Sequence, residues 1–228
     1  MNDPKQQAAL AAVKLITEGH TVGFGAGSTI AHMVNGIVAI PGLKEGIRAV
    51  TSSFSTRLLL ERSGFAVAET GSLTAIDLYF DGCDQFDRHL SALKSGGGIH
   101  TREKVLASMA EKFVLIGDAS KRVDAFDGRY PLVVEVLPIA LRFVEVRLKA
   151  LFPGLRCDLR MAVKKDGAVI TEQGNYLLDC LFEVFPAPER VNDLVGSIPG
   201  VVAHSLFYRL AKLAIVGGSD GIEYIEAC

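Results

Sequence analysis

TVGFGAGSTIAHMVNGIV, residues 21–38, contains a predicted strand, a glycine-rich turn and a predicted helix. The strand covers Thr21 to Phe24, and the helix runs from Ser28 to about Val38. The apolar side chains of the helix recur at i, i+3, i+4 and i+7, which predicts one buried stripe: Ile30, Met33, Val34 and Ile37. A strand that enters a helix through glycines is typical of a parallel sheet covered by helices.

Strand-like and helix-like runs alternate on both sides of this stretch. A helix is predicted near residues 4–17 and further helices near 55–63 and 101–111, with further strands at 47–50, 66–69, 76–80, 90–93 and 112–116. This alternation predicts an α/β fold with a largely parallel sheet and helices on both faces.

From residue 132 the order of elements changes. The sequence predicts a strand (132–136), a helix (139–151), a strand (157–163), a hairpin turn at Asp166-Gly167, a returning strand, a helix (188–197) and a strand (201–207). This β-α-β-β-α-β order is typical of a ferredoxin-like α+β unit. We therefore expect a small inserted domain at 131–206, and a main domain formed by 1–130 plus 207–228 with its last strand at 213–216.

Composition limits the possible partners and compartment. The 228 residues carry a formal net charge of −2, which gives no general attraction to nucleic acid or to an anionic membrane. No segment approaches the roughly 18 uncharged apolar residues of a membrane span. The scattered cysteines suggest neither a zinc site nor a disulfide framework: Cys83, Cys157, Cys180 and Cys228. We expect a soluble, cytoplasmic protein.

The glycine-rich turn G23-F-G-A-G27-S-T29 is a candidate phosphate site. Backbone N–H groups and the hydroxyls of Ser28 and Thr29 can surround an anion at the positive end of a helix dipole. The turn lacks the lysine of a P-loop and the third glycine of the dinucleotide motif, so it points away from ATP and NAD. The alternative is a tight turn that only requires the positive φ of glycine.

Charged residues in 80–111 are candidates for proton transfer. Asp81 and Asp84 follow a predicted strand, Lys94 precedes three glycines, and Glu103 lies in the first turn of a helix, where the dipole favours its ionised form at neutral pH. Each of the four residues also has an ordinary alternative role: Asp81 and Asp84 as turn residues, Lys94 as a surface lysine, and Glu103 as a charge that complements the helix dipole.

The remaining nucleophiles and possible metal ligands carry weaker signals. The five histidines share no metal-ligand spacing and are predicted as surface or helix residues, although His100 lies three residues before Glu103. Cys83 has no neighbouring activating group in the sequence, so we expect a small buried side chain there. No metal or cofactor is expected.

Taken in order, eight motifs resemble ribose-5-phosphate isomerase of the A type over nearly the whole chain: G-x-G-x-G-S-T29, T-S-S53, D-G-x-D84, K-x-G-G-G98, T-R-E-K104, D-A-S-K121, D-G-x-x-x-x-x-x-G-N-x-x-L-D179 and I-P-G-V-V202. The resemblance implies a Rossmann-like three-layer main domain with an inserted ferredoxin-like lid. It also implies a homodimer or homotetramer, no metal, and metal-independent interconversion of D-ribose 5-phosphate and D-ribulose 5-phosphate through an enediolate in the pentose phosphate pathway.

The resemblance also implies roles for particular residues. Glu103 looks like the base that moves a proton between C2 and C1, while Asp81, Asp84 and Lys94 look like the residues that open the sugar ring and stabilise charge on oxygen. The implied substrate contacts are Ala26, Gly27, Ser28, Thr29, Gly82, Cys83, Ser95, Gly96, Gly97 and Lys121.

The sequence departs from the family pattern at several positions within these motifs. Ala26 replaces a usual threonine, Gln85 a glutamate and Ser95 a glycine, and Ile99-His100 stands where small or apolar residues are usual. Two alternatives therefore stay open: a divergent paralogue that isomerises another sugar or sugar phosphate, and a non-catalytic sugar-phosphate sensor.

Overall fold

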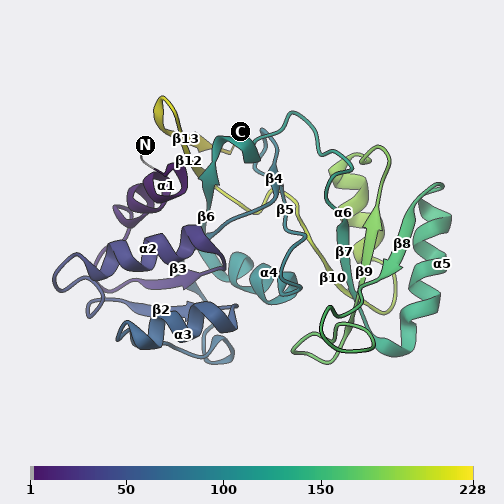
Figure 1. The fold of residues 1–228 in the computed structure, drawn as a ribbon, viewed down its shortest axis with the longest axis horizontal. Helices are drawn as coiled ribbons and strands as arrows, with labels where there is room; N and C mark the ends of the chain where they lie inside the picture. Colours follow the sequence, from purple (N-terminus) through teal and green to yellow (C-terminus); the bar gives the residue numbers. More distant parts are fainter. Residues whose placement is uncertain (1–2, 228) are drawn as a thin grey trace.

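The computed structural model describes residues 3–227 and is built around a six-stranded sheet (Figure 1). Its strands lie in the order β13 (Gly221–Glu226), β12 (Leu213–Gly218), β6 (Ala110–Asp118), β3 (Ile76–Asp81), β1 (Thr21–Phe24) and β2 (Arg48–Thr51). All neighbouring pairs are parallel except β12 and β13. The predicted α/β fold class with a largely parallel sheet is confirmed.

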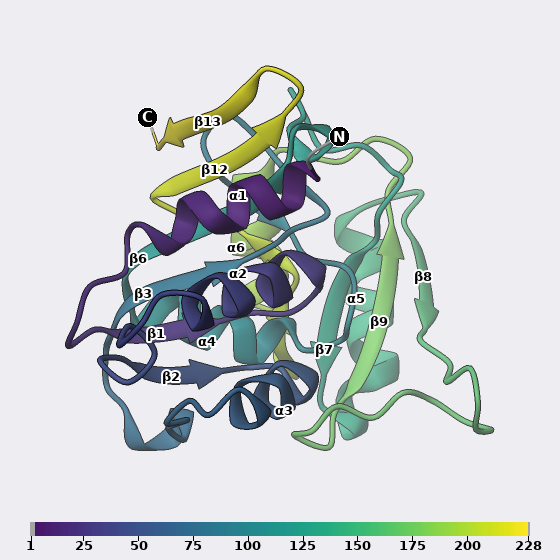
Figure 2. The same cartoon turned by 60° about the vertical axis from the view of Figure 1, so that its left-hand side comes forward.

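Helices cover both faces of this sheet. Figure 2 shows α1 (Pro4–Val13), α2 (Ser28–Val38) and α3 (Phe54–Arg62) in front of it and α4 (His100–Met109) behind it. Successive side chains of a strand point to opposite faces. In β3, Leu78 and Phe80 pack in the layer beneath α1 and α2, whereas Tyr79 packs in the layer on the α4 side. Asp81, two residues after Tyr79, therefore faces the helix that carries Glu103.

A second, four-stranded antiparallel sheet lies beside the first (Figure 1). Its strands lie in the order β10 (Val201–His204), β7 (Leu132–Val136), β9 (Tyr176–Leu181) and β8 (Arg156–Leu159), with helices α5 (Leu141–Leu151) and α6 (Pro188–Gly196) and the short 3-10 helix η3 (Pro138–Ala140). The order β7-α5-β8-β9-α6-β10 is the β-α-β-β-α-β order expected for this part of the chain. The domain boundaries at 131 and 206 and the role as a lid stay predictions.

A small three-stranded sheet joins the two larger ones. It contains β11 (Leu206–Phe207), β5 (Ala92–Leu93) and β4 (Gln85–Phe86). The strand predicted at 201–207 is divided at Ser205, whose N–H donates to the carbonyl of Val133 while its own carbonyl accepts from Lys94 N–H, at 2.8 and 3.0 Å. The chain changes sheets at this residue and brings the second sheet next to Lys94.

Several predicted strands are shorter than expected or differently placed. At Leu90 the backbone is left-handed (φ 57°), because Asp87 Oδ1 accepts from the N–H groups of His89 and Ser91, so only Ala92–Leu93 is extended. Residues 66–69 make a single parallel bridge, from Val67 to Ala49. After the Asp166-Gly167 turn, the returning strand β9 begins only at Tyr176.

Three short elements of the structure were not predicted: an edge strand and two 3-10 helices. The edge strand β13 follows a tight turn after β12, and the dipeptide Asp220-Gly221 is the signal that could have predicted it. Short 3-10 helices occur at η1 (Thr70–Ser72) and η2 (Ala119–Lys121). Among the described residues, no helix is both long enough and apolar enough to cross a membrane.

Candidate active site

A cavity of about 310 Å³ opens at the carboxyl ends of β1, β3 and β6. These ends meet at one edge because the three strands are parallel neighbours in the sheet. The chain passes from β1 outward to β2 and returns to β3 on the other side of β1, so the strand order reverses at this point. Ligands of open α/β sheets collect at such a reversal.

Asp81 is the most enclosed charged residue of the cavity, with 1% of its surface exposed. Its Oδ1 accepts from the N–H groups of Gly82 and Ala26 at 2.8 and 3.2 Å, and its Oδ2 accepts from the Tyr79 hydroxyl at 2.6 Å. Gly25 makes room for it, because a Cβ on Gly25 would lie 1.9 Å from Asp81 Cγ. The carboxylate is therefore fixed in one position by its neighbours.

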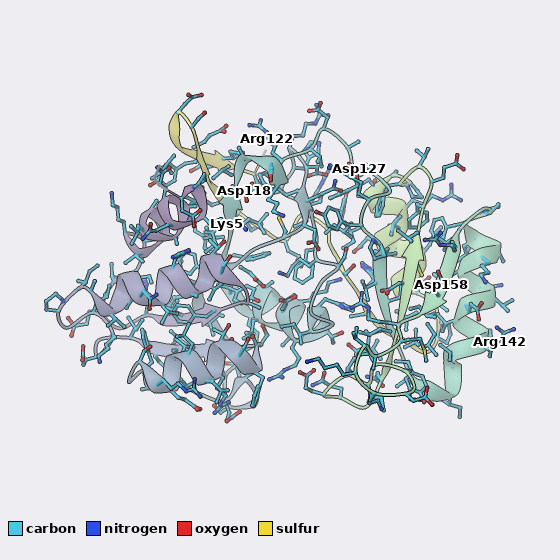
Figure 3. The ribbon with its side chains drawn as sticks, in the orientation of Figure 1. Lys5, Asp118, Arg122, Asp127, Arg142 and Asp158 are labelled. Atoms are coloured by element: carbon cyan, nitrogen blue, oxygen red, sulfur yellow. The ribbon has the colours of Figure 1, made fainter. Side chains whose placement is uncertain are left out.

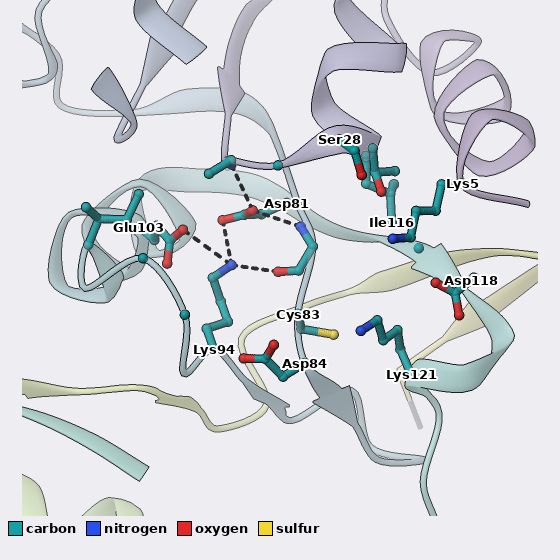
Figure 4. A pocket seen from close by; sticks show the side chains of 18 residues that line it. Lys5, Ser28, Asp81, Cys83, Asp84, Lys94, Glu103, Ile116, Asp118 and Lys121 are labelled. Carbon is teal, nitrogen blue, oxygen red and sulfur yellow. Dashed lines mark hydrogen bonds and ion pairs between the residues drawn. The ribbon is translucent and has the colours of Figure 1, made fainter. Parts of the chain in front are cut away.

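Lys94 connects Asp81 with Glu103 (Figure 4). Its Nζ lies 2.9 Å from Asp81 Oδ2 and 3.5 Å from Glu103 Oε1, and it donates to the carbonyl of Gly82 at 2.6 Å. Both Lys94 and Glu103 are buried, at 7% and 5% exposure. One buried cation thus lies between two carboxylates that come from β3 and α4.

Burial changes the protonation of this group. It raises the pKa of Glu103 to about 8; the Lys94 ammonium opposes this rise and Asp81 adds to it. Burial therefore acts against the ionised form of Glu103 that the helix dipole is expected to favour at neutral pH. For Lys94, burial acts to lower the pKa, but Asp81 and Glu103 raise it above the ordinary lysine value.

The other end of the cavity is suited to an anion. Gly27, at the N-cap of α2, has a φ of 99° and no side-chain cap, so the first N–H groups of the helix face the cavity at the positive end of the dipole. Ser28, Thr29 and Lys121 also line the cavity there. Figure 4 shows Ser28 and Lys121 on the side away from Glu103.

Lys5 is a further cation at this end that the sequence analysis did not identify. It lines the cavity from the first turn of α1, and Figure 3 shows it near Asp118. Gly217 allows this approach, because a Cβ there would lie 2.0 Å from the Pro4 carbonyl oxygen. The glycine pair at the end of the last predicted strand is the sequence signal for such a close contact.

Asp118, the first residue of the D-A-S-K motif, also lines the cavity. Burial acts to raise its pKa, but hydrogen bonds from Ser120 and the nearby Lys121 and Lys5 lower it below the ordinary value. The lowered pKa favours an ionised Asp118 at neutral pH, and its negative charge attracts the two lysine side chains at the anion end.

Asp84 and Cys83 lie between the two ends of the cavity (Figure 4). Asp84 Oδ2 accepts from the Ser95 N–H at 2.6 Å, which fixes the start of the glycine turn. Burial raises the pKa of the Cys83 thiol to about 12, so it stays protonated at neutral pH and is a poor nucleophile.

The structure brings most of the predicted site residues together around one cavity. Asp81, Asp84, Lys94 and Glu103 line it, together with these predicted contacts: Ala26, Gly27, Ser28, Thr29, Gly82, Cys83, Gly96, Gly97 and Lys121. Ile99, Ile116 and Gly117 also line it and were not among the predicted contacts.

Three of the unusual residues point away from the cavity. The predicted contact Ser95 does not line it, because its hydroxyl donates to the Pro131 carbonyl at 2.6 Å. Gln85 is buried and accepts from Asp127 N–H at 3.4 Å. His100 is fully buried at the start of α4, as the prediction of surface or helix residues allows, and burial lowers its pKa to about 3. That prediction is wrong for His204, which is buried on strand β10.

The hydroxyls of the T-S-S53 motif, at Thr51 to Ser53, cap a helix. Ser53 is the N-cap of α3 and accepts from Thr56 N–H, while Thr51 Oγ1 accepts from Ser53 N–H. These residues do not line the cavity. Across residues 3–227, no group of three or more histidine, cysteine, aspartate or glutamate side chains is arranged to hold a metal ion.

The arrangement is suited to moving a proton on an anionic small molecule. A buried carboxyl with a pKa near neutrality is suited to general base catalysis. A buried ammonium next to it can stabilise negative charge that develops on oxygen. The helix N-terminus and two lysines at the opposite end are suited to a phosphate group.

Comparison with known proteins agrees with this chemistry. Residues 48–221 match the family model described as ribose 5-phosphate isomerase A (phosphoriboisomerase A). The ribose-5-phosphate isomerase A of Methanosarcina acetivorans is 40% identical over 95% of this chain and 91% of its own length. The protein of the same name from Thermosynechococcus vestitus is 39% identical over 93% of this chain and 90% of its own length.

Solved structures give the same result. Ribose 5-phosphate isomerase A of Methanocaldococcus jannaschii superposes with a TM-score of 0.87 at 30% identity, covering 97% of both chains. A D-ribose-5-phosphate isomerase in complex with phospho-erythronic acid superposes with a TM-score of 0.89 at 32% identity, also covering 97% of both chains.

Proposed function

The chain belongs to the ribose 5-phosphate isomerase A family, and from this premise we propose that it interconverts D-ribose 5-phosphate and D-ribulose 5-phosphate in the pentose phosphate pathway. The observation that carries the proposal is the cavity itself. It has the Asp81–Lys94–Glu103 group at one end and the N-terminus of α2 with Lys5 and Lys121 at the other. Its volume lies at the small end of the range for ligand pockets, roughly 300–1,000 Å³.

In the proposed reaction, Glu103 is the base that removes the C2 proton of the open-chain aldose and returns a proton to C1. Its raised pKa matches this role, because a base is most effective when its pKa lies near the working pH. The charge that develops on oxygen in the enediolate is stabilised by Lys94, which Asp81 holds in place at 2.9 Å. Asp84 and Asp81 are the proposed groups for ring opening.

The phosphate of the substrate is proposed to bind at the opposite end of the cavity. The N–H groups that begin α2, the hydroxyls of Ser28 and Thr29, and the side chains of Lys5 and Lys121 supply the donors. This contact places the sugar carbons toward Glu103. No metal or cofactor is needed for the proposed steps.

Assay of the purified protein tests the proposal directly. Incubation with ribose 5-phosphate is expected to give the ketose, and Glu103→Gln is expected to lower kcat by about 10²-fold or more, the usual contribution of a general base. Glutamine keeps the size of the side chain, so a loss of activity reflects the missing carboxylate. Absence of ketose formation by the parent would refute the assignment, and full activity of the variant would remove Glu103 as the base.

The departures from the family pattern bear on substrate choice. Gln85, Ser95 and His100 lie outside the cavity, whereas Ala26 and Ile99 line it, so these two residues are the changes with direct access to substrate. This favours ribose 5-phosphate over a different sugar. A panel of phosphorylated and unphosphorylated sugars tests this substrate preference. A higher kcat/KM for another sugar would support the divergent paralogue. Binding of ribose 5-phosphate without turnover would support the sugar-phosphate sensor.

A homodimer or homotetramer in the cytoplasm is part of the proposal. Helix α5 and the turn before it expose apolar side chains at Ile139, Phe143 and Val146, at 95%, 51% and 58% exposure, and such a stripe is suited to a protein interface. Analytical ultracentrifugation of the purified protein tests the assembly, and a monomer at all concentrations would contradict it.

A further inference from the structure

Two motifs contain residues that the proposed reaction does not use. Thr101 belongs to T-R-E-K, the motif of Glu103, and Asn175 and Asp179 belong to the motif that ends in β9. Thr101 lies more than 70 positions before Asn175 and Asp179 in the chain. Hydrogen bonds through Glu135 and Arg160 nevertheless connect all three residues with the segment 95–101, which joins Lys94 to the first turn of α4.

The end of this segment nearest Glu103 is held by Glu135. This carboxylate lies on β7 of the second sheet and is 1% exposed. Its Oε2 accepts from the Thr101 hydroxyl in the first turn of α4. Its Oε1 accepts from the Thr171 hydroxyl and from Asn175 Nδ2, both at 2.8 Å. Glu135 thus joins the helix of the base to the turn before β9.

The end of the segment nearest Lys94 is held by Arg160. Its Nη2 donates to the Ser95 carbonyl at 2.9 Å, and its Nε donates to both oxygens of Asp179 at 3.0 Å. Asp179 lies on β9, directly in the second sheet. The guanidinium is therefore held in place while it fixes the residue that follows Lys94.

The middle of the segment 95–101 packs closely against the second sheet. Gly98 is buried and has a φ of 71°, and a Cβ on it would lie 2.8 Å from Leu177 Cδ1 on β9. The second sheet therefore contacts the segment at its start, its middle and its end. The 3.5 Å separation of Lys94 Nζ and Glu103 Oε1 depends on where these contacts place the two ends.

We propose that Glu135 is a positioning residue that sets Glu103 against Lys94 through the Thr101 hydroxyl. The proposal rests on the proposed function, in which Glu103 is the base. Thr101 and Glu103 lie in the same first turn of α4, so a displacement of one moves the other. A shift of about 1 Å in a reacting group can lower a rate by about 10²-fold.

The ordinary alternative is that Glu135 only stabilises the turn at 171–175. The two oxygens of the Glu135 carboxylate have different partners, so a pair of matched variants can separate the two roles. Thr101→Val removes the hydroxyl on the α4 side, and Thr171→Val removes a hydroxyl on the other side, with nearly the same change in shape. Thr101→Ser keeps the hydroxyl and is the conservative control.

The experiment measures kcat and KM of the parent and these variants with ribose 5-phosphate, on protein whose folding is verified by circular dichroism. Thr101→Val is expected to lower kcat by about 10- to 100-fold. Its KM is expected to stay within about threefold, because the anion end is built from the first sheet. Thr101→Ser and Thr171→Val are expected to keep kcat within about twofold. Glu135→Gln provides a second test and is expected to lower kcat as Thr101→Val does.

A titration separates failure of this proposal from failure of the proposed function. Carbon-13 NMR of the Glu103 carboxyl is expected to show a higher pKa in Thr101→Val than in the parent, because the carboxylate loses part of its contact with Lys94. This readout needs no turnover. An inactive parent with a raised pKa in the variant would refute the isomerase and keep the positioning role. An unchanged pKa and kcat in Thr101→Val, or equal losses in Thr101→Val and Thr171→Val, would overturn the positioning role.

Discussion

Replacement of Gly25 by alanine would place a methyl group where the Asp81 carboxylate lies. A Cβ at this position would be 1.9 Å from Asp81 Cγ, 2.0 Å from Oδ1 and 2.4 Å from Oδ2. Non-bonded carbon atoms separate to about 3.5 Å or more, so the carboxylate has to move by about 1.5 Å. Both oxygens of the Asp81 carboxylate have hydrogen-bond or ion-pair partners, so a movement of this size breaks its present contacts.

The contacts that break set the size of the effect. Asp81 Oδ2 lies 2.9 Å from Lys94 Nζ and 2.6 Å from the Tyr79 hydroxyl, and neither distance survives such a shift. We expect kcat for ribose 5-phosphate to fall by about 10²-fold or more, because Lys94 loses the partner that positions it. The free energy of unfolding is expected to fall by about 1–3 kcal/mol, the cost of leaving buried polar groups without partners.

Steady-state kinetics together with urea unfolding checks this prediction. Gly71→Ala is the control, since a Cβ on Gly71 has nothing within 4 Å. That variant is expected to match the parent in both measurements. If Gly25→Ala keeps kcat within about twofold of the parent while it folds normally, the fixed position of Asp81 is not required for catalysis.

Two further predictions concern pH. Since a base acts when deprotonated and the pKa of Glu103 is raised to about 8, kcat/KM is expected to rise about tenfold per pH unit until it levels near pH 8; a flat pH profile below that value would contradict the assignment. His100 is buried with its pKa lowered from 6.5 to about 3, so the stability that it confers as a neutral group is present above pH 6.5 and is lost as the pH falls toward 3. Each pH unit in this window costs about 1.4 kcal/mol, so between pH 6.5 and about pH 5 the parent should lose about 2 kcal/mol more than His100→Leu in urea unfolding. Equal losses in the two proteins would contradict this prediction.

The contacts of the second sheet also bear on its predicted role as a lid. Arg160 and Glu135 hold the two ends of the segment that connects Lys94 with Glu103. A movement of this sheet toward the cavity would either break these hydrogen bonds or carry Lys94 and Glu103 with it. Closure of a lid and positioning of the base are therefore coupled through the same few contacts.

The fold class and the set of reacting groups followed from patterns within short windows of sequence. Apolar spacing predicted the strand and helix of 21–38, and the ends of predicted strands pointed to Asp81 and Asp84. Such patterns work because side-chain direction in a strand or helix is fixed by backbone geometry over a few residues. The glycine turn at 23–27 likewise predicted an anion site at the start of a helix.

Other features depend on residues that meet only in the folded chain. Lys5 reaches the cavity because Gly217 leaves room for Pro4, and Ser95 turns from the cavity toward the carbonyl of Pro131. No sequence pattern indicates a role for Glu135, since its three partners lie at 101, 171 and 175. No local pattern encodes contacts of this kind.

Glu103 shows the same difference between what a local sequence pattern predicts and what the folded chain decides. By itself the sequence predicted a glutamate in the first turn of a helix, after Lys94 and a glycine turn, and so indicated a candidate base. Only the tertiary structure decided that this carboxyl is 5% exposed and carries a pKa of about 8. The physical reason is that a charge loses its hydration when other parts of the chain pack around it. The groups that act on the Glu103 carboxyl are Asp81 at the end of β3 and Lys94 after β5, and neither belongs to its own helix.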